Sequence, residues 1–336
     1  MPGTPARSGR AAAALTLVDA LQLRLADRLA AVGGSPFVPV EWLRDEGRHG
    51  GGVRLVAPDG PVFDRASVNV SAIHYDDLPD KRLASATALS AIVHPANPAA
   101  PSMHTHVSWT ELRDGAGTWR IMGDLNPSNP APPDTAAFVD ALREAAGPHF
   151  DGAAAQGDRY FTIPALDRHR GVAHFYLEGF STGDWDADAA FATRVAHGII
   201  DTYGDILDDA VDRTVTDAML AAQRHYHTVY LFQVLTLDRG TTSGLLVHDQ
   251  NDVGILGSLP STVDRDLLAS WASLVPEPQP ALVRALVHAI PPTGRIDVPA
   301  KRELAAAVRA HYLANPAALD LQARGDVLPP TVANHQ

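Results

Sequence analysis

Four β-rich runs follow one another through short turns, and this pattern constrains the fold more than any other feature of the sequence. The runs are the segments 66–73, 86–93, 104–112 and 118–122. In the first, Val68, Val70 and Ala72 alternate with more polar residues, as expected for a strand with one buried face. Asp114-Gly115 predicts the hairpin between the last two runs. Strands joined in this way predict an antiparallel sheet.

Helical patterns precede and follow these runs. Apolar residues at spacings of three and four predict an amphipathic helix that ends at Gly33 and Gly34. These residues are Val18, Leu21, Leu25, Leu29 and Val32. The segment 186–224 predicts two helices with a break near Tyr203. The predicted fold class is therefore α+β, with helices gathered before and after a large antiparallel sheet.

Further β-structure is expected after the second helical region. The segment 227–237 is rich in β-branched and aromatic residues and predicts a long strand. A turn at 238–241 leads to the apolar run GLLVH, and a hairpin at 249–252 leads to VGILGS.

We expect three parts along the chain. Residues 1–11 are rich in Pro, Gly and Arg and are expected to be disordered. Residues 12–275 form the main domain, because no linker-like stretch interrupts the core of this region. Residues 276–336 are expected to form a helical C-terminal extension with a loose tail.

The composition excludes several classes of protein. The formal net charge of −12 argues against a nucleic-acid partner, whose phosphates would be repelled. The absence of cysteine excludes disulfides and thiolate metal sites. No apolar run is long enough to predict a membrane span, and the N-terminus lacks the apolar core of a secretory signal. We therefore expect a cytoplasmic protein.

Three histidines are concentrated in the stretch SAIVHPANPAAPSMHTHVSWTEL at residues 90–112. His94 closes one predicted strand, and His104 and His106 open the next. Residues at i and i+2 on a strand project from the same face, so this corner can hold a site. Paired imidazoles can bind a divalent metal when a third ligand joins them, and His174 is one available partner.

Two polar groups stand where strands are predicted to end. Asp124 lies in GDLNP, and Asp238 and Arg239 lie in LDRGT. An arginine can hold a substrate carboxylate while a neighbouring aspartate takes a proton. The alternative is that Asp238 is a turn residue and Arg239 a surface cation. The familiar nucleotide-binding, hydrolase and metalloprotease motifs are absent.

An ordered set of motifs between residues 50 and 260 resembles the oxygen-dependent coproporphyrinogen III oxidase family. The motifs are GGGVRLVAPDGPVFDRASVNVSAIHYDDLP, IVHPANPAAPSMHTHV, MGDLNPSNP, RYFTIPALDRHRGVAHFYLEGF, LDRGTTSGLL and ILGSLP. The resemblance implies a large antiparallel sheet flanked by α-helices on both sides and a homodimer. It also implies oxidative decarboxylation of two propionates, with O₂ as co-substrate and no organic cofactor.

The resemblance also implies roles for individual residues. The implied catalytic residues are His104, Asp124, Asp238 and Arg239. The candidate substrate-binding residues are Ser90, His94, His106 and Ser108. Within the first set, His104 is the implied proton donor. Within the second, Ser90 and His94 match positions that bind substrate in the family.

The departures from the family leave the substrate open. Ser108 stands where the family usually has an arginine, and the segment 248–251 lacks the arginine of a carboxylate-binding hairpin. His106 and His174 stand where the family rarely has histidine. Three readings follow: an O₂-dependent oxidase of coproporphyrinogen III or another electron-rich carboxylate, a metal-dependent oxidase or oxygenase of a smaller specialised metabolite, and a non-catalytic tetrapyrrole-binding relative. The second would use His104, His106 and His174 as ligands.

Overall fold

The computed structural model describes residues 1–248 and 251–324, and its centre is a seven-stranded antiparallel sheet in the order β1-β2-β3-β4-β5-β6-β9. Its strands are β1 (Val38–Leu43), β2 (Gly50–Val56), β3 (Phe63–His74), β4 (Leu83–Pro95), β5 (Ser102–Leu112), β6 (Gly117–Asn126) and β9 (Ala173–Phe180). A second pair consists of β7 (Thr162–Ile163) and β8 (Arg168–His169). The predicted antiparallel sheet is confirmed. The turn between β5 and β6 contains Asp114 and Gly115, and the positive φ of Gly115 suits glycine.

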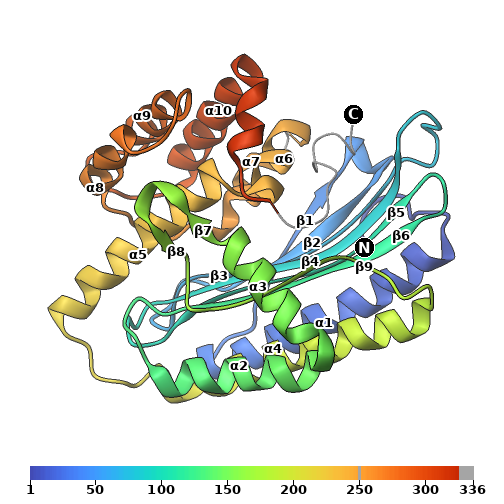
Figure 1. Ribbon diagram of the computed structural model, residues 1–336, viewed down its shortest axis with the longest axis horizontal. Coiled ribbons are helices and arrows are strands. Elements are labelled where there is room, and N and C mark those ends of the chain that lie inside the picture. The colour runs from blue at the N-terminus through green and yellow to red at the C-terminus, as the bar shows by residue number, and fades with distance from the viewer. Residues whose placement is uncertain (249–250, 325–336) are drawn as a thin grey trace.

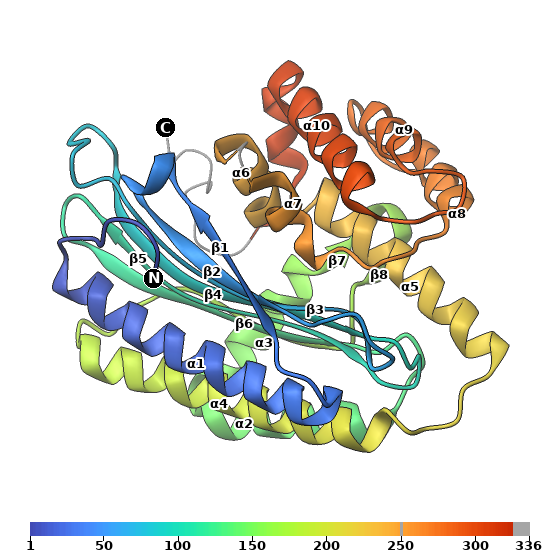
Figure 2. The same ribbon diagram turned by 180° about the vertical axis from the view of Figure 1, so that it is seen from behind.

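Helices α1 (Gly9–Gly33), α2 (Pro132–Ala146) and α4 (Trp185–Ala210) cover one face of the sheet, and α3 (Phe150–Tyr160) packs along β9 (Figures 1 and 2). The predicted amphipathic stripe of α1 packs onto this face, with Leu21 and Leu25 in the same core cluster as Val68 and Val93. The helix begins within the segment 1–11, because the Ser8 hydroxyl accepts a hydrogen bond from the Ala11 N–H at 3.2 Å.

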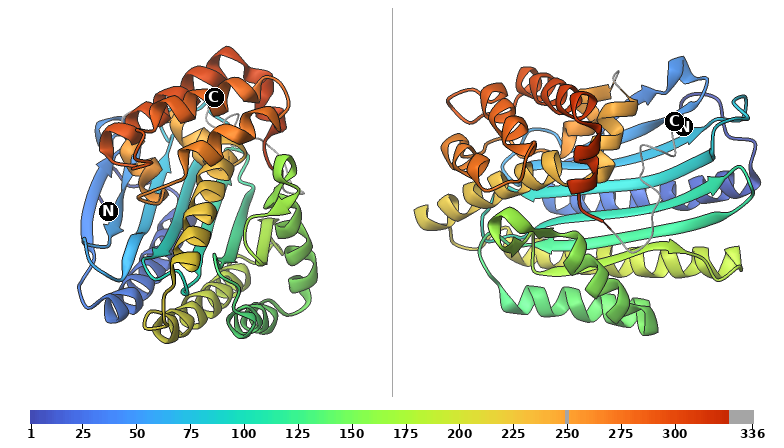
Figure 3. Two further views of the ribbon diagram at one scale, coloured as in Figure 1. Left: turned by 90° about the vertical axis from the view of Figure 1, so that its left-hand side faces the viewer. Right: turned by 45° about the horizontal axis from the view of Figure 1, so that its top comes forward.

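The opposite face is covered over part of its length by the remaining helices (Figures 1 and 3). These are α5 (Asp217–Thr236), α6 (Arg239–Val247), α7 (Asp252–Ile255), α8 (Arg265–Ser270), α9 (Gln279–Ala289) and α10 (Val298–Ala314). Short 3₁₀ turns lie at η1 (Asp45–Gly47), η2 (Gly147–His149), η3 (Pro164–Leu166), η5 (Leu256–Ser258), η6 (Trp271–Ser273) and η7 (Pro316–Leu321). Helices therefore flank the sheet on both sides, as expected.

The strand predicted at 227–237 is wrong, because this segment forms the C-terminal half of α5. Every residue from Tyr226 to Thr236 is buried, in a helix surrounded by α6, α8, α9 and the sheet. A helix that is buried on all sides needs apolar residues all round and loses its amphipathic period. The β-branched and aromatic residues therefore reflected burial rather than a strand.

Three smaller expectations are corrected with it. GLLVH is the last turn of α6 with its C-cap His248, and VGILGS lies in α7 and η5. The hairpin expected at 249–252 lies partly outside the described residues, and Asp252 begins α7. The helix break expected near Tyr203 occurs instead after Ala210, where α4 ends. No helix among the described residues is both long and apolar enough to cross a membrane.

The C-terminal helices belong to one apolar cluster with α5. Leu268 of α8, Leu282 of α9 and Leu304 of α10 pack in the same buried group as Leu235 of α5. This apolar cluster is a second core, and it holds α6 and α7 over the sheet face opposite α1. The space between them contains the candidate site.

Candidate active site

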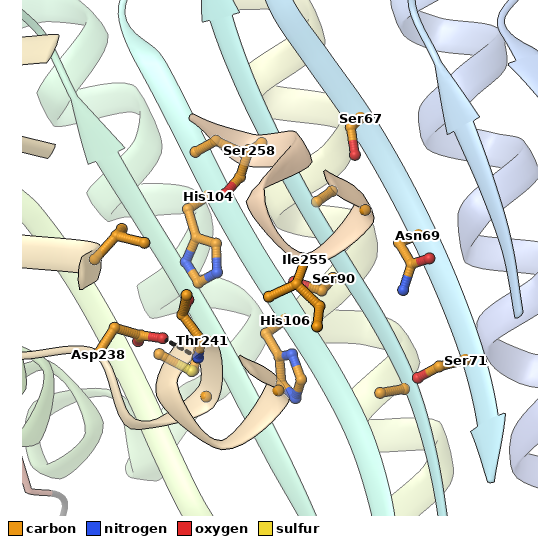
Figure 4. A pocket seen from close by; sticks show the side chains of 18 of the residues that line it. Ser67, Asn69, Ser71, Ser90, His104, His106, Asp238, Thr241, Ile255 and Ser258 are labelled. Atoms are coloured by element: carbon orange, nitrogen blue, oxygen red, sulfur yellow. Dashed lines mark hydrogen bonds between the residues drawn. The ribbon is translucent and has the colours of Figure 1, made fainter. Parts of the chain in front are cut away.

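A cavity of about 300 Å³ lies between the sheet and the helical roof formed by α6, α7 and η5. The sheet contributes Ser67, Asn69, Ser71, Ser90, His104 and His106 to its lining, and the roof contributes Asp238, Thr241, Ile255 and Ser258. Figure 4 shows both imidazoles on the sheet face, opposite the turns that carry the roof residues. Polar groups reach the cavity from both sides, among apolar residues such as Ile92, Met122 and Val234, as expected for a site in which a few polar groups orient a ligand.

The strand register brings His104 and Asp124 together. His104 on β5 lies opposite Asp124 on β6, and residues opposite each other in an antiparallel pair share one face. The His104 Nδ1 and Asp124 Oδ1 atoms are 2.8 Å apart. Because a carboxylate accepts, Nδ1 donates, and Nε2 is the ring nitrogen left for the cavity. Asp124 lies inside β6 rather than after it, which corrects the expectation of a strand end.

Asp124 is completely buried and ionised. Burial raises the pKa of its carboxyl group, but Arg170 and His104 outweigh burial and hold this pKa well below its usual range. Arg170 donates from Nη2 to Asp124 Oδ2 at 2.7 Å, and the Asn126 side-chain amide donates to the same oxygen at 2.6 Å. A carboxylate held by three donors is a weak base. It suits a positioning role toward His104 better than proton abstraction.

Arg170 lines the cavity and was not assigned from the sequence. Its side chain is 3% exposed, and Nη1 donates to the Gln233 side-chain oxygen of α5 at 2.8 Å. The guanidinium carbon lies 4.4 Å from the centre of the Phe161 ring and 5.2 Å from that of Tyr230. Its only signal in the sequence was its place in the RHRG stretch before a strand.

Asp238 faces the site from the roof. It is the N-cap of α6: its Oδ1 accepts from the Thr241 N–H at 2.7 Å, and its Oδ2 accepts from the Tyr160 hydroxyl at 3.0 Å. Asp238 lines the cavity, whereas Arg239 begins α6 and is not among the lining residues. Asp238 therefore follows a helix, not the strand expected before it.

The remaining expected binding residues divide into two groups. Ser90 and His106 line the cavity. Ser108 is 6% exposed and is not a lining residue, and its hydroxyl lies 2.9 Å from His106 Nε2. Burial, with Arg120 and His104 nearby, holds the pKa of His106 well below its usual range. His106 is therefore a neutral hydrogen-bonding group.

His94 lies outside the cavity lining. It is completely buried under α5, and its Nδ1 is 2.9 Å from the Ser102 hydroxyl. Its ring packs edge-on against Tyr230, with centroids 4.6 Å apart, and Tyr230 lines the cavity. His94 can thus influence the site by supporting Tyr230, without touching a ligand.

The three candidate metal ligands do not form a ligand set. His104 and His106 bond to Asp124 and Ser108, as described above. His174 is 2.7 Å from Asp158 Oδ1 and donates to the Arg170 main-chain oxygen at 2.5 Å. No group of three His, Asp or Glu side chains among residues 1–248 and 251–324 is arranged to hold a metal ion. The arrangement of these three histidines therefore does not fit a divalent metal ion.

Two further cavity residues escaped the sequence analysis. Arg120 lines the cavity from β6, and its Nη2 lies 2.8 Å from Glu178 Oε1. Tyr160 lines it from the end of α3. Burial and Asp238 raise the pKa of Tyr160 well above its usual range, so its hydroxyl stays protonated and remains a donor to Asp238.

Comparisons with known proteins agree with this architecture. The family model of coproporphyrinogen III oxidase matches residues 14–273. An oxygen-dependent coproporphyrinogen-III oxidase of Rickettsia bellii is 30% identical over 244 residues, covering 68% of this chain and 84% of that protein. The mitochondrial oxygen-dependent coproporphyrinogen-III oxidase of Rattus norvegicus is 28% identical, covering 72% of this chain and 60% of that protein. Chloroplastic coproporphyrinogen-III oxidase 1 of Arabidopsis thaliana is 29% identical, with coverages of 73% and 70%. This chain belongs to the coproporphyrinogen III oxidase family.

Proposed function

We propose that this protein is an O₂-dependent oxidase that converts two propionate side chains of coproporphyrinogen III into vinyl groups. The observation that carries the proposal is the His104–Asp124 pair, which Arg170 holds in place. The pair lies on the sheet side of the cavity, which we call the floor, and Asp238 lies in the roof above it. Membership of the family supports the same reaction. The pair supplies an oriented imidazole on the floor, and Asp238 supplies a separate carboxylate in the roof.

Each decarboxylation balances without an added reductant. The side chain R–CH₂–CH₂–COO⁻, one O₂ and one proton give R–CH=CH₂, CO₂ and H₂O₂. The bond to the carboxyl carbon and one C–H bond of the neighbouring methylene break, and the C=C bond forms. The two electrons released reduce O₂ to peroxide. The electron-rich pyrrole is the reductant, and removal of its N–H proton makes it more reactive.

We assign the proton transfers to two groups, Asp238 in the roof and His104 on the sheet. Asp238 lines the cavity and is the carboxylate that can accept the pyrrole proton. His104 presents Nε2 to the same cavity. Once Nε2 has taken up a proton from solvent, the ring is an imidazolium paired with the Asp124 carboxylate, and Nε2 can pass that proton to the departing peroxide. The pKa of Asp124 is held too low for it to serve as the base. Its role is to fix the tautomer and orientation of His104 through the hydrogen bond from Nδ1.

The test is turnover of freshly reduced coproporphyrinogen III under air and under argon. We expect vinyl products and CO₂ under air only. His104→Gln should lower kcat by roughly 10²- to 10⁴-fold, the usual contribution of a positioned proton-transfer group. His149→Gln is the matched control, because His149 is exposed and lies outside the cavity lining. Absence of vinyl products and CO₂ under air would contradict the proposal.

The assembly and the compartment are part of the same proposal. We propose a homodimer that acts in the cytoplasm. The dimer is supported by the outer strand β1, where Val38 is 52% and Leu43 46% exposed at the edge of the sheet. Light scattering of the purified protein should give twice the mass of one chain. A single-chain mass at micromolar concentration would refute the dimer.

A divalent metal is tested separately. Since the candidate ligands bond to other groups, we expect turnover and thermal stability to be unchanged by a chelator. Loss of turnover on chelation, with recovery when one metal is returned, would show that the histidines rearrange to bind it.

A further inference from the structure

Arg120 brings a guanidinium group into the cavity from β6. It lines the cavity and lies directly opposite Ser108 of β5. Its side chain is 29% exposed, whereas that of Arg170 is 3% exposed. The open side of Arg120 therefore faces the space where a ligand binds.

The two arginines that line the cavity among the described residues differ in how many donors they keep. Arg170 uses both terminal nitrogens, on Asp124 and Gln233. Within the described part of the chain, the one acidic partner of Arg120 is Glu178, which it contacts through Nη2 alone. A guanidinium carries five N–H donors, so Arg120 retains donors for an incoming anion.

Glu178 holds Arg120 in place when the cavity is empty. Its side chain is 13% exposed, and burial, together with the Glu178 charge, raises the pKa of the Tyr176 hydroxyl. Burial opposes the charged guanidinium, but Tyr176 and Glu178 outweigh burial and raise the pKa of Arg120. The arginine is thus charged, partly balanced and oriented before a ligand arrives.

We propose that Arg120 binds a substrate carboxylate that does not react, and that it selects a large polycarboxylate over a small acid. The proposal rests on the proposed function, which places the reacting side chain at His104. Arg120 and Asp124 are four residues apart on β6, which is roughly 13 Å along a strand. An anion held at Arg120 is therefore on the order of 10 Å from the reacting group. A single pyrrole acid is too short to contact both, whereas a tetrapyrrole with peripheral propionates spans the distance.

Arg120 lies opposite Ser108 in the paired strands, so Ser108 itself need not contact the ligand. Ser108 and Arg120 face each other across β5 and β6, and like charges at such positions destabilise a sheet. At this pair of positions the guanidinium comes from β6. Ser108 leaves room for it and bonds to His106.

The test compares Arg120→Gln and Arg120→Lys with wild type in two assays. The first is the dissociation constant of coproporphyrin III, the oxidised porphyrin, which has the four carboxylates but does not turn over. The second is KM and kcat for coproporphyrinogen III. Losing a two-point charged contact should weaken porphyrin binding and raise KM by roughly 10- to 100-fold in Arg120→Gln. The kcat should stay within about threefold, because the anchor is far from the chemistry.

The controls separate the charge from its position. Arg143→Gln removes an exposed arginine whose acidic partner is also 2.8 Å away, and it should change neither assay. Arg120→Ser combined with Ser108→Arg moves the guanidinium to the facing strand and should recover part of the lost affinity. Arg120→Lys should lie between wild type and Arg120→Gln.

The outcomes distinguish this inference from the proposed reaction. Unchanged affinity and KM in Arg120→Gln, with wild-type turnover intact, would overturn the anchor and leave the reaction standing. Arg120-dependent porphyrin binding in a wild-type protein that releases no CO₂ would support the anchor and overturn the reaction. An equal loss for a monopyrrole acid would contradict the selection of a large substrate.

Discussion

The floor and the roof of the cavity are built by different physical rules. On the floor, strand pairing places His104 opposite Asp124, and their separation follows from the register of β5 and β6. In the roof, Asp238 reaches the site only because α5 ends and α6 begins there. In paired strands, the register fixes which residues face each other. Where a helix begins or ends depends instead on what the helix packs against. The floor is therefore expected to carry stability together with function, and the roof mainly function.

The largest effect should come from breaking the floor. Asp124→Asn removes the charge that balances Arg170, a cation that is itself buried. We expect the free energy of unfolding to fall by about 3–5 kcal/mol, because an unpaired charge remains in the interior. Turnover should fall as well, since His104 loses the acceptor that orients it. Urea unfolding and steady-state rates measure the two losses.

Asp140→Asn is the matched control for this prediction. It breaks the exposed pair with Arg143, which should be worth at most about 1 kcal/mol. If Asp124→Asn were no more destabilising than this control, the floor would not contribute to the free energy of unfolding as predicted.

The second prediction concerns the roof. Asn and Asp cap helices about equally well, so Asp238→Asn should keep α6 in place and change stability by less than about 1 kcal/mol. The same change removes a base, and kcat should fall by roughly 10²- to 10⁴-fold. Asp264→Asn, at the N-cap of α8, should leave kcat unchanged. A large stability loss in Asp238→Asn would remove the contrast between roof and floor.

The third prediction is the pH dependence of the floor. The pKa of Asp124 is lower in the folded protein than in the unfolded chain, so its stabilising effect is complete above the unfolded value of about 4. It is lost only as pH falls toward the folded pKa. The difference in unfolding free energy between wild type and Asp124→Asn should therefore be constant from pH 8 to 5. It should shrink below pH 4, and a difference that already shrinks at pH 6 would contradict this origin.

A smaller pH effect should come from His106. Its pKa is lowered in the folded protein, so the unfolded chain takes up a proton near pH 6.5 that the folded protein refuses. Wild-type stability should therefore decrease as pH falls from 7 to 5. His106→Asn should reduce that slope, and unfolding midpoints at three pH values would measure it. An unchanged slope would assign the effect to other buried histidines.

Local pattern predicted the strands and one side of the site. The alternation in β3 and the turn at Asp114-Gly115 led to the sheet, and the i, i+2 spacing placed His104 and His106 on one face. The roof could not be predicted in the same way. The segment that became α5 has the composition of a strand, and only its burial on all sides makes it a helix. A second core contributed by α8–α10 supplies that burial.

Arg170 shows the other limit of the sequence. Its partners Asp124 and Gln233 are 46 and 63 residues away in the chain, so no local spacing could link them. Arg120 was hidden for a related reason, because its relation to Ser108 exists only across paired strands. In both cases the residue type was visible and its partner was not. The resemblance to the family pointed to His104 and Asp124, but not to the groups that hold them.

The central claim is that floor and roof act together in an O₂-dependent decarboxylation. The most direct measurement is simultaneous O₂ uptake and CO₂ release from carboxyl-labelled coproporphyrinogen III. The account predicts one O₂ consumed and one CO₂ and one H₂O₂ formed for each vinyl group, with all four rates reduced together in Asp238→Asn. CO₂ release without matching O₂ uptake, or vinyl formation under argon, would contradict it.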